Sequence, residues 1–147
     1  MSRAARFVRE DLPEGILLAG SPKRMDDLML QGKRSALMPY KLAHPWFIDY
    51  YDKVRERTRA TLKAHFAAGP EPLNALHERY GVTHFLIEKE LFDRAKVREK
   101  VFIRPYNEEV YQDLGQRETF YLWPLPRDLV LWEDDRYAII ELPIPSG

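Results

Sequence analysis

The sequence predicts an α/β fold, in which a layered sheet of three parallel strands is flanked by helices and followed by a C-terminal antiparallel hairpin. Short apolar segments alternate with amphipathic helical segments in the first 90 residues, and two apolar runs around the letters EDD close the chain. Strands that alternate with helices pair in parallel, because right-handed crossovers carry the helices onto the faces of the sheet. The 147 residues fit a single domain, 1–147, with one core.

The first 40 residues contain two helix–strand pairs. Residues 2–15 have an apolar side that stops at a proline and a glycine, which is typical of a short amphipathic helix. Residues 15–20, GILLAG, form an apolar run between glycines and predict a strand buried on both faces. Residues 21–32 predict a turn and a helix that ends at a glycine, and residues 35–40 predict a second short strand closed by a proline.

A long helix follows and is predicted to begin at Pro45. Apolar, aromatic and small polar side chains recur at helical spacing over about five turns: Phe47, Tyr50, Tyr51, Val54, Thr58, Thr61, Leu62 and His65. The opposite side carries charge: Lys53, Arg55, Glu56, Arg57, Arg59 and Lys63. Residues 72–81 predict a shorter helix with Gly81 as its C-cap, and residues 82–90 contain the β-branched and aromatic residues that favour a third strand.

The last third of the chain has a weaker signal before its final hairpin. Residues 107–116 predict a helix opened by Asn107, and residues 118–126 are predicted to be extended. Residues 129–143 contain two apolar runs around EDD, which is the pattern of a β-hairpin. We expect this hairpin to extend one edge of the parallel sheet with antiparallel strands.

Composition excludes several classes of function. Lys and Arg together number 23, as do Asp and Glu, so the basic excess of a general nucleic-acid-binding protein is missing and no nucleic-acid partner is predicted. The chain has no cysteine, which excludes disulfides and thiol catalysis. Its four histidines show no HxH or HExxH spacing, so neither a metal site nor a cofactor is predicted. No apolar run approaches the ~20 residues of a membrane span.

His44 and Pro45 raise a choice between a helix start and a reactive group. The residue before a proline is disfavoured in the helical region, and proline is favoured at the first position of a helix. We therefore expect His44 to lie at the start of the long helix, with its ring hydrogen-bonded to nearby backbone. A ligand contact stays as the alternative, because this loop follows the carboxyl end of a strand, where ligands bind in α/β sheets.

Charged residues near strand ends and on the long helix carry weaker signals. Lys23 and Arg24 lie near a predicted helix N-terminus that can hold an anion, although the segment lacks both glycine-rich nucleotide motifs. Glu88, Glu90 and Asp93 follow the third strand, yet nothing in the sequence pairs them as acid and base. The basic side of the long helix favours a solvated face, with contact to an anionic membrane surface as the alternative.

Four segments resemble, in the same order, parts of one group of proteins. AARFVREDLPEGILLAGSP (4–22) resembles the segment after the last membrane span of many polytopic bacterial membrane proteins, and HPWFIDYYDKVRERTRATLKAHFAA (44–68) resembles the helix that follows it. ALHERYGVTHFLIEKELF (75–92) resembles their next strand, and LVLWEDDRYAIIELP (129–143) resembles their closing hairpin. The chain therefore resembles the soluble C-terminal extracytoplasmic domain of glycosyltransferase-like membrane proteins, which are distantly similar to oligosaccharyltransferases and protein mannosyltransferases.

This resemblance implies a non-catalytic accessory domain that contacts a sugar or an acceptor, or that docks a partner. The family's catalytic carboxylates lie in loops between membrane spans, and this chain has neither such spans nor the WWDYG-type motif of the oligosaccharyltransferases. The implied partners are the membrane-embedded portion of the same protein and carbohydrate, and the implied location is the extracytoplasmic (periplasmic) face of the membrane. Arg24, Tyr40, His44 and Trp46 are the expected ligand contacts, because they lie where the first two strands end.

Two other interpretations stay open. The chain can be a standalone small α/β protein that binds a phosphorylated metabolite, in which case a cytoplasmic location is expected. Alternatively, it can be a structural interaction module that forms a homodimer through the exposed edge of the hairpin.

Overall fold

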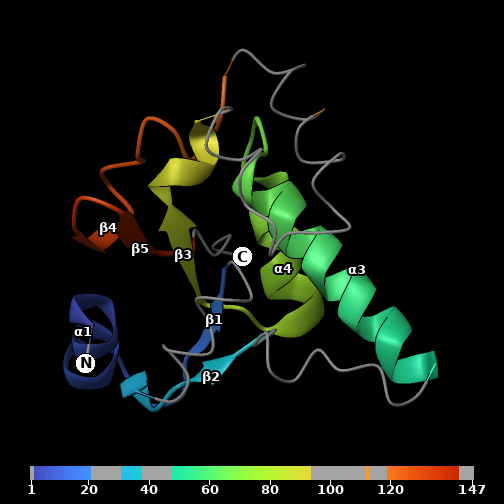
Figure 1. Cartoon of the computed structure of the whole chain (residues 1–147), viewed down its shortest axis with the longest axis horizontal. Helices are drawn as coiled ribbons and strands as arrows, with labels where there is room; N and C mark the ends of the chain where they lie inside the picture. Colours follow the sequence, from blue (N-terminus) through green and yellow to red (C-terminus); the bar gives the residue numbers. More distant parts are fainter. Residues whose placement is uncertain (1, 21–30, 38–47, 94–111, 113–118, 143–147) are drawn as a thin grey trace.

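The computed structural model describes residues 2–20, 31–37, 48–93, 112 and 119–142. These residues contain five strands of one sheet: β1 (Leu17–Ala19), β2 (Ser35–Ala36), β3 (His84–Glu88), β4 (Val130–Glu133) and β5 (Tyr137–Glu141). The helices are α1 (Arg3–Asp11), α3 (Ile48–His65), α4 (Glu71–Tyr80) and the short 3-10 helix η2 (Lys89–Phe92). The strands lie side by side in the order β2-β1-β3-β5-β4 (Figure 1).

The pairing of the strands confirms the predicted sheet. β1 runs parallel to β2 on one side and to β3 on the other, so that Leu18 lies opposite both Ala36 and His84. β5 runs antiparallel to β3 with Phe85 opposite Ile140, and β4 pairs antiparallel with β5 at the edge. The hairpin therefore extends the three parallel strands with two antiparallel ones.

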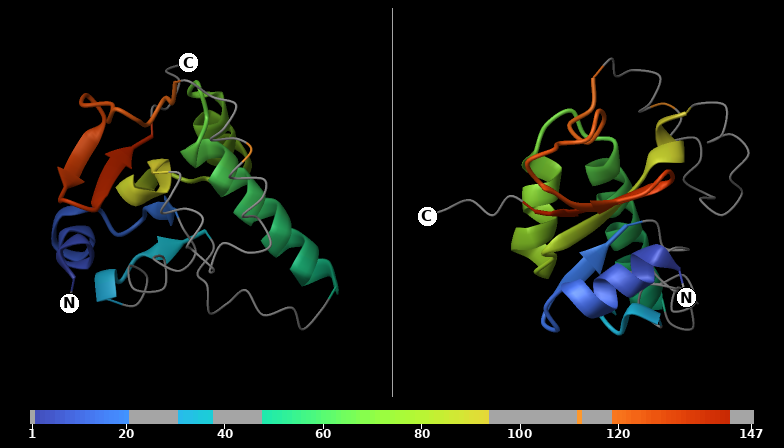
Figure 2. Two further views of the ribbon diagram at one scale, coloured as in Figure 1. Left: turned by 45° about the horizontal axis from the view of Figure 1, so that its top comes forward. Right: turned by 90° about the vertical axis from the view of Figure 1, so that its left-hand side faces the viewer.

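Helices cover both faces of this sheet, with α1 on one face and α3 and α4 on the other (Figures 1 and 2). The side chains of β3 alternate between the two faces. Phe85 and Ile87 pack in the core cluster that includes residues of α3 and α4, whereas Leu86 packs in the cluster that includes α1. All five residues of β3 are buried, as expected for a strand covered by helices on both sides.

Side chains form hydrogen bonds with backbone groups at both ends of α1. The Ser2 hydroxyl accepts a hydrogen bond from the N–H of Ala5 at 3.1 Å, which is the usual N-cap contact. At the other end, the guanidinium of Arg34 donates to the carbonyls of Arg9 and Leu12 at 3.1 and 2.6 Å. The last carbonyls of a helix lack partners within the helix, so this cation supplies a donor to two carbonyls at that end and complements the helix dipole. Arg34 thereby fixes α1 to the segment before β2.

The buried stripe of the long helix is confirmed where its side chains are described. Thr58, Thr61, Leu62 and His65 of α3 are all buried. The predicted start at Pro45 lies outside the described residues, as do most of the helices predicted at 21–32 and 107–116.

α4 ends as the sequence predicts. Gly81 has φ 78° and ψ 18°, the left-handed conformation that glycine adopts without steric cost. Its N–H donates to the carbonyl of His77 at 2.8 Å, and the N–H of Val82 donates to the carbonyl of Leu76 at 3.4 Å. The bond from Gly81 to His77 is the one that defines the αL cap motif, and this cap directs the chain from α4 into β3.

Residues 119–127 differ from the extended segment expected at 118–126. Their described backbone contains bends and a turn and no strand. Two prolines in this stretch lack an N–H group, so it cannot donate a regular ladder of hydrogen bonds. Instead, Leu122 is fully buried in the core, and the N–H of Tyr121 donates to the carbonyl of Ala67 at 2.8 Å. The segment closes the core beside the end of α3.

Candidate functional site

The residues expected to contact a ligand, Arg24, Tyr40, His44 and Trp46, lie outside the described residues. The strands that lead to them are described. Since β1 is parallel to both β2 and β3, the carboxyl ends of these three neighbouring strands lie at one edge of the sheet. Ligands bind at this edge in open α/β sheets. The described side of the candidate site is therefore the end of β3, together with η2 and the side chains that they contact.

A buried histidine contacts the end of β3. His65 is the last residue of α3 and Glu88 is the last residue of β3, and each is 1% exposed. The backbone N–H of Glu88 donates a hydrogen bond to Nε2 of His65 at 3.0 Å. Because Nε2 is the acceptor, the neutral ring carries its proton on Nδ1, which has no hydrogen-bond partner within the described part of the chain. Burial disfavours the charged ring and lowers the pKa of His65 to about 3. His65 is thus a neutral link between α3 and β3.

His65 belongs to an aromatic cluster at this end of the sheet. Its ring stacks on Phe92 with the ring centroids 4.9 Å apart, and Phe92 in turn stacks on Trp123 at 5.5 Å and an interplanar angle of 14°. The remaining members of the aromatic cluster are Phe66, Phe85 and Phe120. Trp123 is 40% exposed, so the cluster reaches from the core to the surface. Sequence reasoning placed His65 on the buried stripe but missed Phe92 and Trp123, which come from distant parts of the chain.

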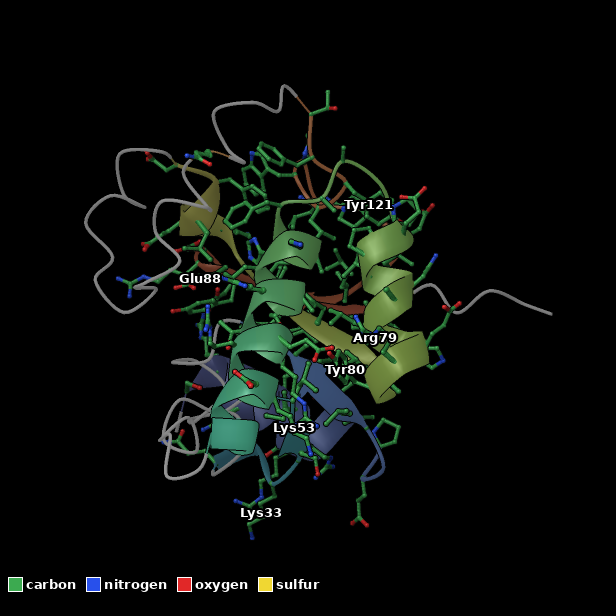
Figure 3. All side chains as sticks on the ribbon, turned by 90° about the vertical axis from the view of Figure 1, so that its right-hand side faces the viewer. Lys33, Lys53, Arg79, Tyr80, Glu88 and Tyr121 are labelled. Carbon is green, nitrogen blue, oxygen red and sulfur yellow. The ribbon has the colours of Figure 1, made fainter. Side chains whose placement is uncertain are left out.

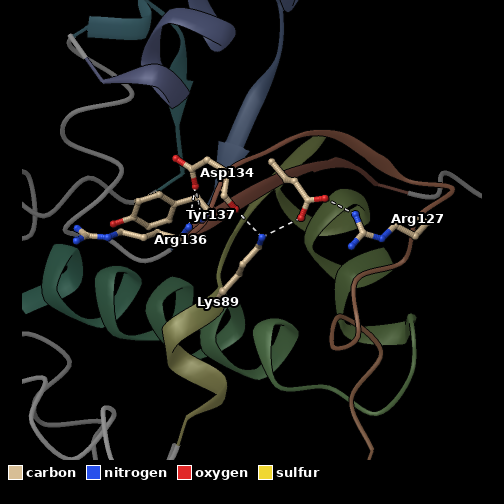
Figure 4. Close-up of polar contacts among 6 residues, drawn as sticks. Lys89, Arg127, Asp134, Arg136 and Tyr137 are labelled. Atoms are coloured by element: carbon tan, nitrogen blue, oxygen red, sulfur yellow. Dashed lines mark hydrogen bonds and ion pairs between the residues drawn. The ribbon is translucent and has the colours of Figure 1, made fainter.

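Ion pairs fix η2 to the hairpin, as Figure 4 shows. Nζ of Lys89 lies 2.8 Å from one carboxylate oxygen of Glu133 and also donates to the carbonyl of Asp134. Arg127 pairs with the other oxygen of Glu133. The hydrogen bond from Lys89, followed by the one from Arg127, lowers the pKa of Glu133. The carboxylate of Asp134 accepts the N–H of Tyr137 at 2.7 Å and shapes the turn. The charged side chains of Lys89, Arg127, Glu133 and Asp134 therefore serve to connect η2, the hairpin and its turn.

The carboxylates predicted after the third strand do not share one environment. Glu88 is buried, Glu90 is half-buried and Asp93 is exposed. In the described ranges, no group of three or more His, Asp or Glu side chains is placed to hold a metal ion. None of the described helices has both the length and the apolar character needed to cross a membrane.

Two further histidines have local hydrogen-bond partners. Nδ1 of His84 lies 2.8 Å from the hydroxyl of Thr83, and Nδ1 of His77 donates to the carbonyl of Val82 at 2.9 Å. Burial lowers the pKa of His84, and the nearby charge of Glu141 opposes that effect. His84 is therefore a buried histidine whose Nδ1 has a hydrogen-bond partner.

In the described part of the chain, two hollows lie against helices. The larger, of about 500 Å³, lies between α3 and α4 and is walled by Arg55, Arg59, Lys63 and Arg79 among others. The smaller, of about 270 Å³, lies between α1 and β4. The sequence showed that one side of α3 is basic, but the groove exists only because α4 packs beside it.

Comparison with solved structures relates this fold to a known domain. The C-terminal globular domain of the oligosaccharyltransferase AfAglB-S2 from Archaeoglobus fulgidus superposes on this chain with a TM-score of 0.59. The superposition covers 97% of this chain and 99% of that domain. The chain has the fold of an oligosaccharyltransferase globular domain. The two sequences are 13% identical, so the likeness concerns the fold. No family model and no curated protein matches the chain.

The oligosaccharyltransferase-like fold agrees with the coarse part of the resemblance seen in the sequence. The superposition extends over nearly the whole of both chains, so it includes the parallel strands, the covering helices and the hairpin together. A shared hairpin or a single shared helix–strand pair would not produce such coverage.

Proposed function

We propose that the chain is a non-catalytic accessory domain of a glycosyltransferase-like membrane protein, held on the extracytoplasmic face of the membrane. The observation that carries this proposal is the superposition on an oligosaccharyltransferase C-terminal globular domain over 97% of one chain and 99% of the other. The resemblance of four ordered segments to the tail of polytopic bacterial glycosyltransferase-like proteins supports the same assignment.

The partner in this proposal is the membrane-embedded portion of the same protein. Such a domain holds a sugar or an acceptor near chemistry performed by residues elsewhere. Arg24, Tyr40, His44 and Trp46 are the proposed contact residues, since they follow β1 and β2 in the chain. The parallel pairing of β1, β2 and β3 supports their convergence, because the carboxyl ends of adjacent parallel strands share one edge.

The reading frame upstream of Met1 offers the first test. The proposal expects a continuous reading frame that encodes paired apolar segments of about 20 residues each. A membrane preparation of the natural host should then transfer glycosyl groups to an acceptor only when this domain is present. Deletion of residues 1–147 should abolish that transfer, whereas the purified chain should neither transfer nor hydrolyse glycosyl groups. Glycosyl transfer by the purified chain would show that the accessory assignment is wrong.

The sugar contact needs a separate measurement. Nuclear magnetic resonance titration of the chain with mono- and disaccharides should shift the amide signals of residues 40–46, and Trp46→Ala should remove the shifts. Trp132→Ala provides the matched control, because Trp132 lies on β4 and stacks on Phe7 of α1. Absence of shifts between Tyr40 and Trp46 at millimolar sugar would exclude these residues as the contact.

A further inference from the structure

The groove between α3 and α4 has a small-residue floor and charged walls. Ala60 of α3 and Pro72 and Ala75 of α4 line it, and their short side chains leave a hollow of about 500 Å³ between the two helices. Figure 3 looks onto these two helices, with Arg79 and Tyr80 of α4 between them. A volume of this size is in the range that holds small ligands.

Positive charge exceeds negative charge in this groove. Arg55, Arg59 and Lys63 recur every four residues and therefore form one row along α3, and Arg79 faces them from α4. Two carboxylates, those of Asp52 and Glu56, also line the groove, so the walls carry an excess of two positive charges in a chain whose formal net charge is zero. Charges that line a cleft of low dielectric focus the field inside it.

The negative charge is confined to one end of the groove. Asp52 and Glu56 belong to the first half of α3, whereas Arg59 and Lys63 belong to the second half. Glu56 is already paired, since its Oε1 lies 2.6 Å from Nη2 of Arg79 and accepts the hydroxyl of Tyr80 at 3.0 Å. Among the residues that line the groove, the carboxylates therefore lie toward one end, and Arg59 and Lys63 lie toward the other.

We propose that this end of the groove binds a phosphate group. Guanidinium and ammonium groups supply several N–H donors, and charge-assisted hydrogen bonds to phosphate oxygens are stronger than neutral ones. The proposal goes beyond the accessory function and does not depend on it. Two sources supply the same chemistry, namely the headgroup of an anionic phospholipid and a soluble phosphorylated compound.

Binding is tested on the complete chain with two probes. The first probe is inorganic pyrophosphate, followed by titration calorimetry and by the amide signals of α3 and α4. The second is vesicles of phosphatidylglycerol and phosphatidylcholine, compared with vesicles of phosphatidylcholine alone, followed by cosedimentation. Binding of pyrophosphate assigns a soluble phosphate, and binding to the anionic vesicles alone assigns a lipid headgroup. Either result supports the phosphate site, and failure of both probes at 50 mM salt overturns it.

Three single-charge variants show whether the groove itself is the site. Lys63→Gln should weaken binding about fivefold, the value expected for one cation near an anionic surface. Glu56→Gln should tighten binding, because it removes a negative charge from the groove wall. Lys53→Gln removes one positive charge from the same helix but outside the groove lining, and should change binding less than twofold. Equal weakening by Lys63→Gln and Lys53→Gln would mean that binding depends only on the overall charge of the chain. The groove would then not be the phosphate site.

A change of stability cannot mimic this pattern. Lys53, Glu56 and Lys63 are all exposed, and their substitution should leave the thermal unfolding midpoint within a few degrees of the parent chain. Loss of the accessory function would not alter the result, because both probes act on the purified chain. Conversely, loss of phosphate binding would leave the dependence of glycosyl transfer on the domain untouched.

Discussion

The backbone N–H of Glu88 donates a hydrogen bond to Nε2 of His65 at 3.0 Å, inside the core and between the last residue of β3 and the last residue of α3. The histidine is 1% exposed and neutral, and its ring stacks on Phe92 of η2. This contact joins the helix layer to the edge of the sheet where the parallel strands end. Protonation of His65 therefore opposes folding.

Stability is expected to fall as the pH drops below 6.5. The pKa of His65 is about 3 in the folded chain and has its ordinary value of 6.5 in the unfolded chain, so the unfolded chain takes up a proton that the folded chain cannot. Between these values the free energy of unfolding should decrease by about 1.4 kcal/mol per pH unit from His65 alone, and above pH 6.5 this dependence should vanish. Urea unfolding at pH 7.5, 6.0 and 5.0 measures the slope.

His65→Gln provides the comparison, because its amide oxygen can accept the same N–H without titrating. The variant loses packing and starts less stable, but its free energy of unfolding should depend less steeply on pH below 6.5. The pKa of His84 is also lowered by burial, but His84 is present in both chains, so its contribution to the pH dependence cancels in the comparison. Parallel pH slopes for the two chains would contradict the assignment to His65.

Arg34 should contribute more to the free energy of unfolding than an ordinary surface cation does. It donates to the carbonyls of Arg9 and Leu12 at the end of α1 and to that of Pro13 at 2.8 Å. Arg34→Met keeps most of the side-chain bulk but leaves these carbonyls without their donor, and should reduce the free energy of unfolding by about 2 kcal/mol. Lys33→Met removes a neighbouring exposed cation and should cost less than about 0.5 kcal/mol. Equal losses would assign the effect to net charge.

Gly81 and Gly15 should respond differently to alanine. Neither position has a heavy atom within 4 Å of the added Cβ, so the two differ in backbone conformation alone. Gly81→Ala forces a left-handed conformation with φ 78° on an L-residue and should destabilise the chain by about 1 kcal/mol. Gly15→Ala should be neutral or slightly stabilising, since it restricts the unfolded chain. Chemical denaturation of both variants measures the difference, and a neutral Gly81→Ala would contradict the cap.

Phe92 should hold the surface end of the aromatic cluster in place. It contacts the rings of His65, Phe66, Phe120 and Trp123, although it is only partly buried. Phe92→Ala should therefore cost about 2 kcal/mol, at the lower end of the values for fully buried phenylalanines. The fluorescence of Trp123 should also shift to longer wavelength, because the ring loses its stacking partner.

Leu131→Ala is the control for this loss of apolar surface. Leu131 is 42% exposed and lies at the irregularity of pairing between Val130 and Trp132. Its truncation should change the free energy of unfolding by less than about 0.5 kcal/mol and leave the fluorescence unchanged. Similar losses in the free energy of unfolding for Phe92→Ala and Leu131→Ala would mean that the aromatic contacts of Phe92 contribute no more than an exposed apolar side chain does.

The sequence by itself determined the strands of the described sheet, the helices α1, α3 and α4, and the order in which they follow one another. The glycine after HERY predicts the left-handed cap at Gly81, the apolar runs around EDD predict the hairpin, and the alternation of strands and helices predicts the parallel part of the sheet. These signals act over a few residues, through backbone sterics, turn chemistry and periodicity, so a single sequence is enough to carry them. The ligand contacts of Arg24, Tyr40, His44 and Trp46 also come from the sequence pattern, and they stay predictions.

Tertiary structure alone decided the contacts between elements that are distant in the chain. The bond between His65 and Glu88, the capping of α1 by Arg34 and the groove between α3 and α4 each depend on how two elements pack together. A pattern of residue types specifies which face of an element is apolar, but not which partner covers it or which polar atoms then meet. Packing of the whole core fixes those distances, and for that reason the buried histidine and the basic groove emerged only from the folded chain.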